Sequence, residues 1–295
     1  MVAPRAVVVH RASELTELLA RHGTRGQVTF FLEQRGQSLH DVEARHERTS
    51  AALATVAASI PADWRHATVE RAELPRFAFE PADVVIVVGQ DGLVANVAKY
   101  LDAQPVIGID PLPGQSAGIL VPHAPADAAG LIVRAQQGTT SFCERTMVEV
   151  RSDDGQTLTA LNEIMIGQPG HQSARYLLEV SGRTERQSSS GIIVGTGTGA
   201  TGWCRSIARI QAPELPLPGP TERALAWFAR EPWPSPSTGA ELIAGRLDGG
   251  ELALRVESDT LVAFGDGIES DRLSLGWGQR VTVGMSERML RTVSA

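Results

Sequence analysis

Apolar residues in the first 120 positions form short runs separated by segments with helical periodicity. The clearest run is Asp83–Val88, which is apolar after its first residue, as expected of a central parallel strand covered on both faces. Further strands are expected at 5–9, 27–32 and 105–109, and helices at 13–20, 41–59 and 93–101. Strands alternating with helices predict an α/β domain with a parallel sheet over residues 1–125.

The pattern changes after Pro125. One expected helix, at 126–137, is followed by segments in which apolar and polar residues alternate, at 146–150, 176–180 and 252–256. Turn signals such as Asp153-Asp154-Gly155 separate these segments. The second part of the chain, residues 126–280, is therefore expected to be β-rich.

A proline-rich segment interrupts this second part. Seven prolines lie between Pro213 and Pro236, on both sides of residues 221–230, where Leu225, Trp227 and Phe228 suggest an amphipathic helix. We expect a surface excursion with one helix, which is either a mobile loop or a cover for a site or a partner subunit.

Composition excludes several function classes. The 295 residues carry 27 Lys+Arg and 34 Asp+Glu, a formal net charge of −7, and Lys99 is the single lysine. A lysine-dependent phosphate loop is therefore absent, and any bound phosphate must be held by backbone N–H groups, hydroxyls or arginines. The acidic balance, without a basic block, argues against a nucleic-acid partner.

Two isolated cysteines, Cys143 and Cys204, make a disulfide framework or a zinc site unexpected. The apolar run near the start is too short for a signal peptide, and no apolar stretch approaches the ~18 residues that span a membrane. We expect a cytoplasmic protein without a membrane partner.

The first candidate motif is Gly89-Gln90-Asp91-Gly92, between the buried strand and the next expected helix. Ligands bind at the carboxyl ends of strands in open α/β sheets, and glycines there let backbone N–H groups approach a phosphate. Asp91 either orients a reacting hydroxyl as a general base or caps the helix that follows. Position alone does not separate these two roles.

The second motif is the adjacent pair Asn162 and Glu163 in an otherwise apolar segment, 160–166. In one strand the two side chains would point to opposite faces. They would either bind the ribose hydroxyls or base edge of a ligand, or belong to an edge strand with one solvated face.

The third motif is a loop with four glycines and three threonines in positions 195–202, followed by Trp203. Its N–H and O–H donors suit a polyhydroxyl or phosphate ligand. Residues 197–202 also match GxGxxG, but a dinucleotide-binding fingerprint opens the first βαβ unit of a fold, so an oxidoreductase is disfavoured.

In this order, the three motifs resemble the GGDG, NE and TPTGSTAY-like motifs of the NAD kinase family. Segments at 105–110, 160–163, 189–199 and 290–293 are similar to the mitochondrial type of NAD kinase. The resemblance runs from about residue 80 to the C-terminus.

The resemblance implies an N-terminal α/β domain and a β-sandwich-like C-terminal domain with the active site between them, and residues 281–295 returning to the first domain. It implies transfer of a phosphoryl group from ATP, with Mg²⁺, to the adenosine ribose 2′-hydroxyl of NAD, and it suggests a homodimer. Asp91 would accept or orient the hydroxyl proton. The implied phosphate-binding residues are Gly89, Gln90 and Gly92, and the implied NAD-binding residues are Asn162, Glu163, Thr196, Thr198, Gly199, Thr201, Gly202 and Trp203.

Asp266, in Phe264-Gly265-Asp266-Gly267, resembles a late DG motif and would lie near the site or the metal; an ordinary hairpin turn is the alternative. Four positions depart from the family pattern: Gln90 replaces a glycine, Asp110 an asparagine, Ser190 an aspartate and Trp203 a tyrosine. Two other functions stay open on these grounds. One is a non-catalytic nucleotide-binding protein, and the other is a lipid or sphingoid kinase, which would need an apolar acceptor pocket.

Overall fold

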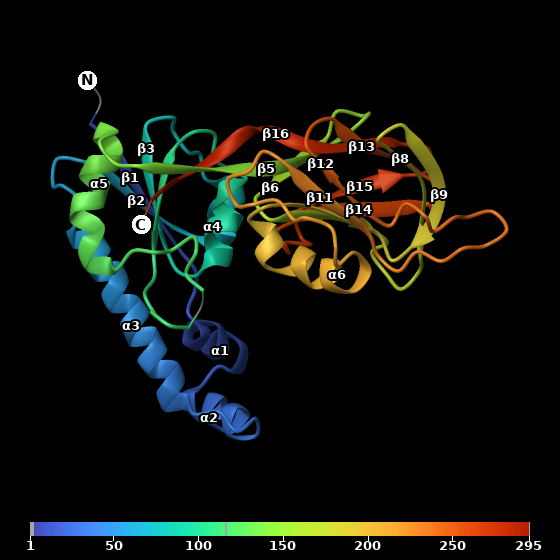
Figure 1. Cartoon of the computed structure of the whole chain (residues 1–295). Helices are drawn as coiled ribbons and strands as arrows, with labels where there is room; N and C mark the ends of the chain where they lie inside the picture. The colour runs from blue at the N-terminus through green and yellow to red at the C-terminus, as the bar shows by residue number, and fades with distance from the viewer. Residues whose placement is uncertain (1–2, 116, 295) are drawn as a thin grey trace. The chain divides into compact units, whose positions relative to one another are not determined.

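The computed structural model describes residues 3–115 and 117–294, and the chain divides into two compact units. Unit 1 comprises Met1–Cys143 and Arg291–Ala295, and unit 2 comprises Glu144–Leu290. Unit 1 is an α/β domain with a parallel sheet, and unit 2 is built of antiparallel sheets (Figure 1). The expected fold class is confirmed.

The sheet of unit 1 has the strand order β2-β1-β3-β4, with every pair parallel. The last residues of the C-terminal strand β16 join it, since Arg291 pairs with Pro105. All six residues of β3 are buried, as its apolar run predicts. The strands are β1 Arg5–His10, β2 Arg65–Glu70, β3 Asp83–Val88, β4 Pro105–Ile109 and β16 Arg280–Val293.

Helices of unit 1 contribute side chains to two separate hydrophobic clusters. Val56 of α3 and Ile132 of α5 pack with Ile86 of the sheet, whereas Val28 of α2 and Leu18 of α1 form a separate small cluster. The helices are α1 Glu14–His22, α2 Arg25–Glu33, α3 Leu39–Ala58, α4 Asp91–Ala98 and α5 Ala128–Gln137, with 3₁₀ turns at Arg71–Arg76 and Pro125–Asp127.

The strand expected at 27–32 is wrong, because these residues form α2. The Thr24 side chain caps the helix by accepting a bond from Gln27 N–H. Val28 and Leu32, four residues apart, are the two buried positions, which is the spacing of one helix face. A short apolar run fits a strand or a helix equally well until its packing partners are known.

Strand β2 was not expected. It is an edge strand whose sequence, Arg-His-Ala-Thr-Val-Glu, buries only Val69, so it lacks the apolar signal of a central strand. Unit 1 also extends past the expected boundary at residue 125, because α5 packs on the parallel sheet through Leu131 and Ile132.

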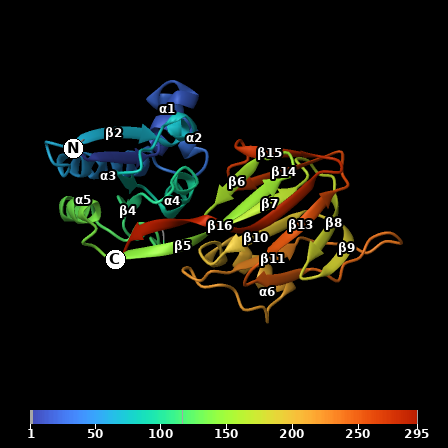
Figure 2. The same ribbon diagram turned by 90° about the horizontal axis from the view of Figure 1, so that it is seen from above.

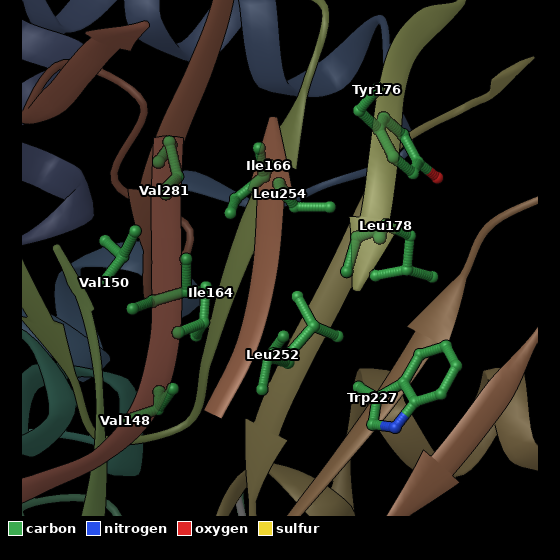
Figure 3. Close-up of a cluster of buried hydrophobic side chains, with 14 of the residues drawn as sticks. Val148, Val150, Ile164, Ile166, Tyr176, Leu178, Trp227, Leu252, Leu254 and Val281 are labelled. Atoms are coloured by element: carbon green, nitrogen blue, oxygen red, sulfur yellow. The ribbon is translucent and has the colours of Figure 1, made fainter. Parts of the chain in front are cut away.

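Unit 2 contains two sheets. The first runs β16-β13-β8-β9, with β5 beside β16 and β6 beside β5; the second runs β12-β11-β10-β7-β14-β15. Apolar side chains from both sheets form one core, among them Val148, Ile164, Trp227 and Leu252 (Figure 3). Figure 2 shows the strands of this unit from a second side.

The first sheet of unit 2 contains β5 Phe142–Ser152, β6 Thr157–Ala160, β8 Ala174–Val180, β9 Arg183–Ser189 and β13 Glu251–Val256. The second contains β7 Glu163–Gly167, β10 Ile192–Thr196, β11 Leu225–Ala229, β12 Ala244–Leu247, β14 Thr260–Gly265 and β15 Arg272–Gly276. A 3₁₀ turn at Gly199–Thr201 and helix α6, Trp203–Gln211, follow β10.

The amphipathic helix expected at 221–230 is wrong, since Leu225–Ala229 form strand β11 between β10 and β12. All five residues of β11 are buried, so Leu225, Trp227 and Phe228 contribute to two layers of core rather than to one helix face. The chain then follows the edge of β9, where Trp233 N–H donates to Ser188 C=O (3.2 Å) and Gly239 N–H donates to Arg186 C=O (2.9 Å).

No helix in the described part of the chain has the length and apolar character needed to cross a membrane.

Candidate functional site

The predicted site residues fall into two groups, one in each unit. Gly89, Gln90, Asp91 and Gly92 lie in unit 1, between β3 and α4. The Asn162–Glu163 pair, the loop 195–203 (the Thr/Gly loop) and Asp266 lie in unit 2. An active site assembled from both groups stays a prediction.

The turn after β3 is tightly packed at its first residue. Gly89 N–H donates to Ile109 C=O (3.0 Å), and a Cβ on Gly89 would lie 2.8 Å from Leu93 Cδ2. The N-cap position of α4 is occupied by Gln90, which is exposed and whose side chain makes no capping bond. The Gln90 amide is thus turned to solvent rather than used to start the helix.

Asp91 is the first residue of α4 and does not cap it. Its carboxylate accepts two backbone bonds from a distant loop, from Leu120 N–H to Oδ1 (2.7 Å) and from Ile119 N–H to Oδ2 (3.2 Å). The same loop is pressed against β4, because a Cβ on Gly108 would lie 1.9 Å from Leu120 C=O. Asp91 therefore fixes the position of this loop beside the carboxyl ends of β3 and β4.

Asp110, which departs from the family pattern, also has a local role. Its Oδ1 accepts a bond from Leu112 N–H (2.8 Å), and its own N–H donates to His123 C=O (2.9 Å). Asp110 thus fixes a turn directly after β4, at the start of the loop whose later residues, Ile119 and Leu120, are bound by Asp91.

In unit 2, Asn162 and Glu163 do not lie in one continuous strand, as was expected. Strand β6 ends at Ala160 and β7 begins at Glu163, so a bend at residues 161–162 separates them. Both side chains are partly exposed. The expectation of strict alternation fails because alternation needs an unbroken strand.

Asp266 holds this bend. Its Oδ2 accepts a bond from Leu161 N–H (2.9 Å) and its Oδ1 one from Asn162 N–H (2.7 Å), while Asp266 N–H donates to Glu163 C=O (3.1 Å). Asp266 lies in the β14–β15 hairpin with φ 52°, a conformation that non-glycine residues seldom adopt. It is thus a hairpin residue and also lies next to the Asn162–Glu163 pair.

Glu163 has an unusual protonation equilibrium. Burial, together with the negative charge of Asp266, raises the pKa of the Glu163 carboxyl from 4.5 to about 7. Burial favours the neutral form, and a neighbouring carboxylate adds to this effect. Glu163 therefore changes charge near neutral pH and can donate a hydrogen bond when protonated.

The Thr/Gly loop packs against the same bend. Thr196 Oγ1 donates to Leu161 C=O (2.6 Å) and accepts from Thr198 N–H (3.1 Å) and Gly199 N–H (3.3 Å). A Cβ on Gly199 would lie 2.2 Å from the Asn162 carbonyl oxygen. The threonine and the glycine thus hold the loop close to the Asn162–Glu163 pair.

Thr198 differs from Thr196 because its hydroxyl is unused. The residue is 5% exposed, and its Oγ1 has no hydrogen-bond partner among the residues that the structure describes. A buried hydroxyl without a partner costs about 1–3 kcal/mol. Such a group is satisfied when a polar ligand atom or a water reaches it.

The end of the loop is more exposed. Thr201 Oγ1 donates to Thr198 C=O (2.9 Å), while Gly202 and Trp203 are exposed at the start of α6. The guanidinium carbon of Arg230 lies 5.4 Å from the centre of the Trp203 ring, within reach of a cation–π contact. The aromatic face of Trp203 is thus partly covered by a cation.

Sequence reasoning missed two features of this site. Cys204 is buried, and its sulfur fills the space beside Gly195. Burial, together with the negative charge of Glu163, raises the pKa of the Cys204 thiol to about 12, so the group stays a neutral thiol at neutral pH. The backbone bonds to Asp91 and Asp266 were also missed, since they join residues 28 or more positions apart. Only the Gly-Asp-Gly spacing around Asp266 hinted at one of them.

A resident metal site is not evident in the described ranges 3–115 and 117–294, where no cluster of three or more His, Cys, Asp or Glu side chains is suited to a metal. Both carboxylate oxygens of Asp266 accept backbone bonds. Metal binding by Asp266 stays a prediction, and Mg²⁺ would enter bound to ATP as part of the substrate.

Comparison with known proteins gives related sequences over part of the chain. The chain is 32% identical over 145 residues to the NAD kinase of Rickettsia africae, which covers 47% of this chain and 53% of that protein. It is 34% identical over 136 residues to the NAD kinase of Acinetobacter baylyi, which covers 43% of each. The matches thus span about half the length of these relatives, and no family model matches the chain.

The fold has a solved counterpart. The crystal structure of yeast NADH kinase complexed with NADH matches with a TM-score of 0.59 at 14% identity, covering 100% of this chain and 84% of that one. The two-unit architecture described above is therefore the fold of yeast NADH kinase.

Proposed function

We propose that this protein is an NAD kinase, which transfers the γ-phosphoryl group of ATP to the 2′-hydroxyl of the adenosine ribose of NAD. The observation that carries the proposal is the convergence of Asn162, Glu163 and the Thr/Gly loop on one bend of unit 2. The proposal is further supported by relatives named NAD kinase, which are 32–34% identical over part of the chain.

The proposed acceptor site is polar, which suits a ribose better than a lipid. Thr198 offers an unsatisfied buried hydroxyl, and Glu163 offers a carboxyl that donates when protonated and accepts when ionised. Asn162 adds an amide with both donors and an acceptor. These groups match the hydroxyls and base edge of a nucleotide, and they argue against an apolar acceptor.

The proposed chemistry relies on positioning and on Asp91. The ribose 2′-oxygen forms a bond to Pγ while the bond between Pγ and the β–γ bridging oxygen breaks, and ADP leaves with its Mg²⁺. The hydroxyl proton passes to the Asp91 carboxylate and then to solvent. General-base help of this kind contributes ~10²–10⁴-fold in rate.

Glycine backbone would hold the phosphates. Gly92, in the first turn of α4, is exposed and brings no Cβ near the helix N-terminus, where N–H groups attract phosphate. The single lysine is no obstacle under this proposal, because the phosphates need backbone N–H groups rather than a lysine.

One assay separates the proposed function from its alternatives. The protein is incubated with NAD, ATP and Mg²⁺, and NADP is detected with an NADP-specific dehydrogenase. We expect NADP to accumulate. NAD binding without NADP would indicate a non-catalytic nucleotide-binding protein. In a parallel incubation with a long-chain base added in place of NAD, phosphorylation of that base would indicate a sphingoid kinase.

The finer assignments belong to the same proposal. The segments at 105–110 and 189–199 support a kinase of the mitochondrial type. We also propose that it acts in the cytoplasm and that it is a homodimer, as the family resemblance suggests. Light scattering of the purified protein measures the mass directly, and we expect twice the 31.5 kDa of one chain. A mass of 31.5 kDa would contradict the dimer.

A further inference from the structure

A polar trough lies in unit 2, lined by none of the candidate site residues. It consists of two hollows of about 520 and 440 Å³ that share Ser173, Arg175 and Glu257 in their walls. Volumes of this size are typical of small-molecule sites. The trough involves β8, β9 and the loop that follows β11, which extends past β9 in Figure 1.

Arg175 presents an unpaired guanidinium to the trough. Its backbone is fixed, since Arg175 N–H donates to Ser258 Oγ (2.9 Å) and its carbonyl accepts from Glu257 N–H (2.9 Å). Its side chain is exposed and makes no hydrogen bond or ion pair with any residue that the structure describes. All of its side-chain donors are therefore available to a ligand.

Arg186 stands in the wall of the same hollow and is only partly used. Its Nε donates to both carboxylate oxygens of Glu257, each at 2.9 Å. Its two terminal amino groups make no bond with described residues, so they remain available. Two guanidinium groups face one carboxylate in this hollow, and the adjoining hollow adds the carboxylate of Asp259. The positive charge is thus confined to the hollow that contains Arg186, which is where a phosphate would bind.

Trp233 supplies an aromatic surface beside these cations. Its side chain is 47% exposed, and its backbone is held by the bond from Trp233 N–H to Ser188 C=O. Thr238 Oγ1 donates to the Trp233 carbonyl (3.2 Å), which anchors the loop on its other side. An exposed indole fixed at its backbone provides a stacking platform for a planar ring.

We propose that this trough is a second nucleotide-binding site, which holds the aromatic base on Trp233 and the phosphate between Arg175 and Arg186. Guanidinium groups match phosphate by paired N–H donors, and this pairing is stronger than a neutral hydrogen bond. The hydroxyls of Ser188 and Ser237, also in the wall, suit the ribose. The proposal does not depend on the proposed kinase activity, because it shares no residue with that site.

The test uses the whole protein labelled with 5-fluorotryptophan and titrated with AMP, followed by ¹⁹F NMR. The chain has five tryptophans, and the Trp233 resonance is assigned from its loss in Trp233→Phe. Trp203 lies in the Thr/Gly loop, so its resonance reports the candidate NAD site separately in the same titration. Trp277, 73% exposed in the turn before β16, serves as a reference outside both sites.

We expect the Trp233 resonance to shift saturably with AMP, at a concentration of about 1 mM or less, which corresponds to about −4 kcal/mol. Arg175→Ala should weaken this binding at least tenfold, whereas Arg272→Ala, an exposed arginine on β15, should leave it unchanged. Adenosine and inorganic phosphate, each alone, should bind at least tenfold more weakly than AMP.

Three results would overturn the proposal. The first is a Trp233 resonance that does not move, whatever happens at Trp203. The second is binding that Arg175→Ala leaves intact, since the guanidinium would then play no part. The third is adenosine binding as tightly as AMP, which would remove the phosphate from the recognition. A shift at Trp203 alone would leave the proposed kinase site standing while refuting this one.

Discussion

Replacing Glu163 with Gln should stabilise the protein above neutral pH and have no effect in acid. The carboxyl is buried beside Asp266, which raises its pKa from 4.5 to about 7. Glutamine has nearly the same shape but no charge, so it removes the cost of ionising this group in the folded protein. Glu269, which is exposed in the β14–β15 connection, provides the matched control as Glu269→Gln.

The size of the effect follows from proton linkage. Between pH 4.5 and about 7 the unfolded chain has lost the Glu163 proton while the folded protein keeps it. The unfolded state then binds fewer protons, so the wild-type free energy of unfolding falls as pH rises through this window. At about 1.36 kcal/mol per pH unit, and allowing for partial exposure of the side chain, the fall amounts to about 2–3 kcal/mol.

Urea unfolding followed by tryptophan fluorescence measures this difference. Four of the five tryptophans, Trp203, Trp227, Trp233 and Trp277, lie in unit 2, so the signal reports the unit that contains Glu163. We expect Glu163→Gln to match the wild type at pH 4.5 and to exceed it by about 2–3 kcal/mol at pH 8. Parallel pH profiles for the two proteins, with the Glu269→Gln control, would refute the assigned burial and charge coupling.

Three further substitutions test the site. Thr196→Val removes a buried hydroxyl that makes three bonds, and should lower the free energy of unfolding by about 2–4 kcal/mol in urea titrations. Thr198→Val removes a buried hydroxyl that has no partner, so it should raise the free energy of unfolding by about 1–3 kcal/mol while weakening NAD binding measured by calorimetry; an unchanged NAD affinity would contradict the proposed contact. Gly199→Ala places a Cβ 2.2 Å from a backbone oxygen and should abolish NAD binding; wild-type affinity would show that the loop can move aside.

Much of unit 1 was predictable because its central strands carry their own signal. The run at Asp83–Val88 is apolar enough to identify a buried parallel strand without any tertiary information. The segment 27–32 was expected to be a strand and is a helix, and the segment 221–230 was expected to be a helix and contains a strand. Both errors arise because short apolar runs fit either element. Which faces are buried decides between them, and burial depends on the neighbours that each segment meets in the folded chain.

The candidate site was predictable in its residue types and not in its contacts. Gly89–Gly92, Asn162–Glu163 and the Thr/Gly loop could be selected because glycine and polar residues interrupt apolar segments. The pKa of Glu163 could not be predicted, because it depends on burial and on Asp266, more than 100 residues later. The two hydrogen bonds that Asp91 accepts from the backbone N–H groups of Ile119 and Leu120 could not be predicted either, because they depend on how a distant loop folds back.

The central claim is tested most directly by the product of the reaction, compared between the wild type and Asp91→Asn. NAD, ATP and Mg²⁺ are mixed with each protein, and ³¹P NMR is used to look for a phosphomonoester on the adenosine 2′-oxygen. The account predicts this signal for the wild type, in one-to-one ratio with ADP, and a loss of at least ~10²-fold in rate for Asp91→Asn with NAD still bound. A wild-type protein that binds NAD but leaves ATP unconsumed would contradict it.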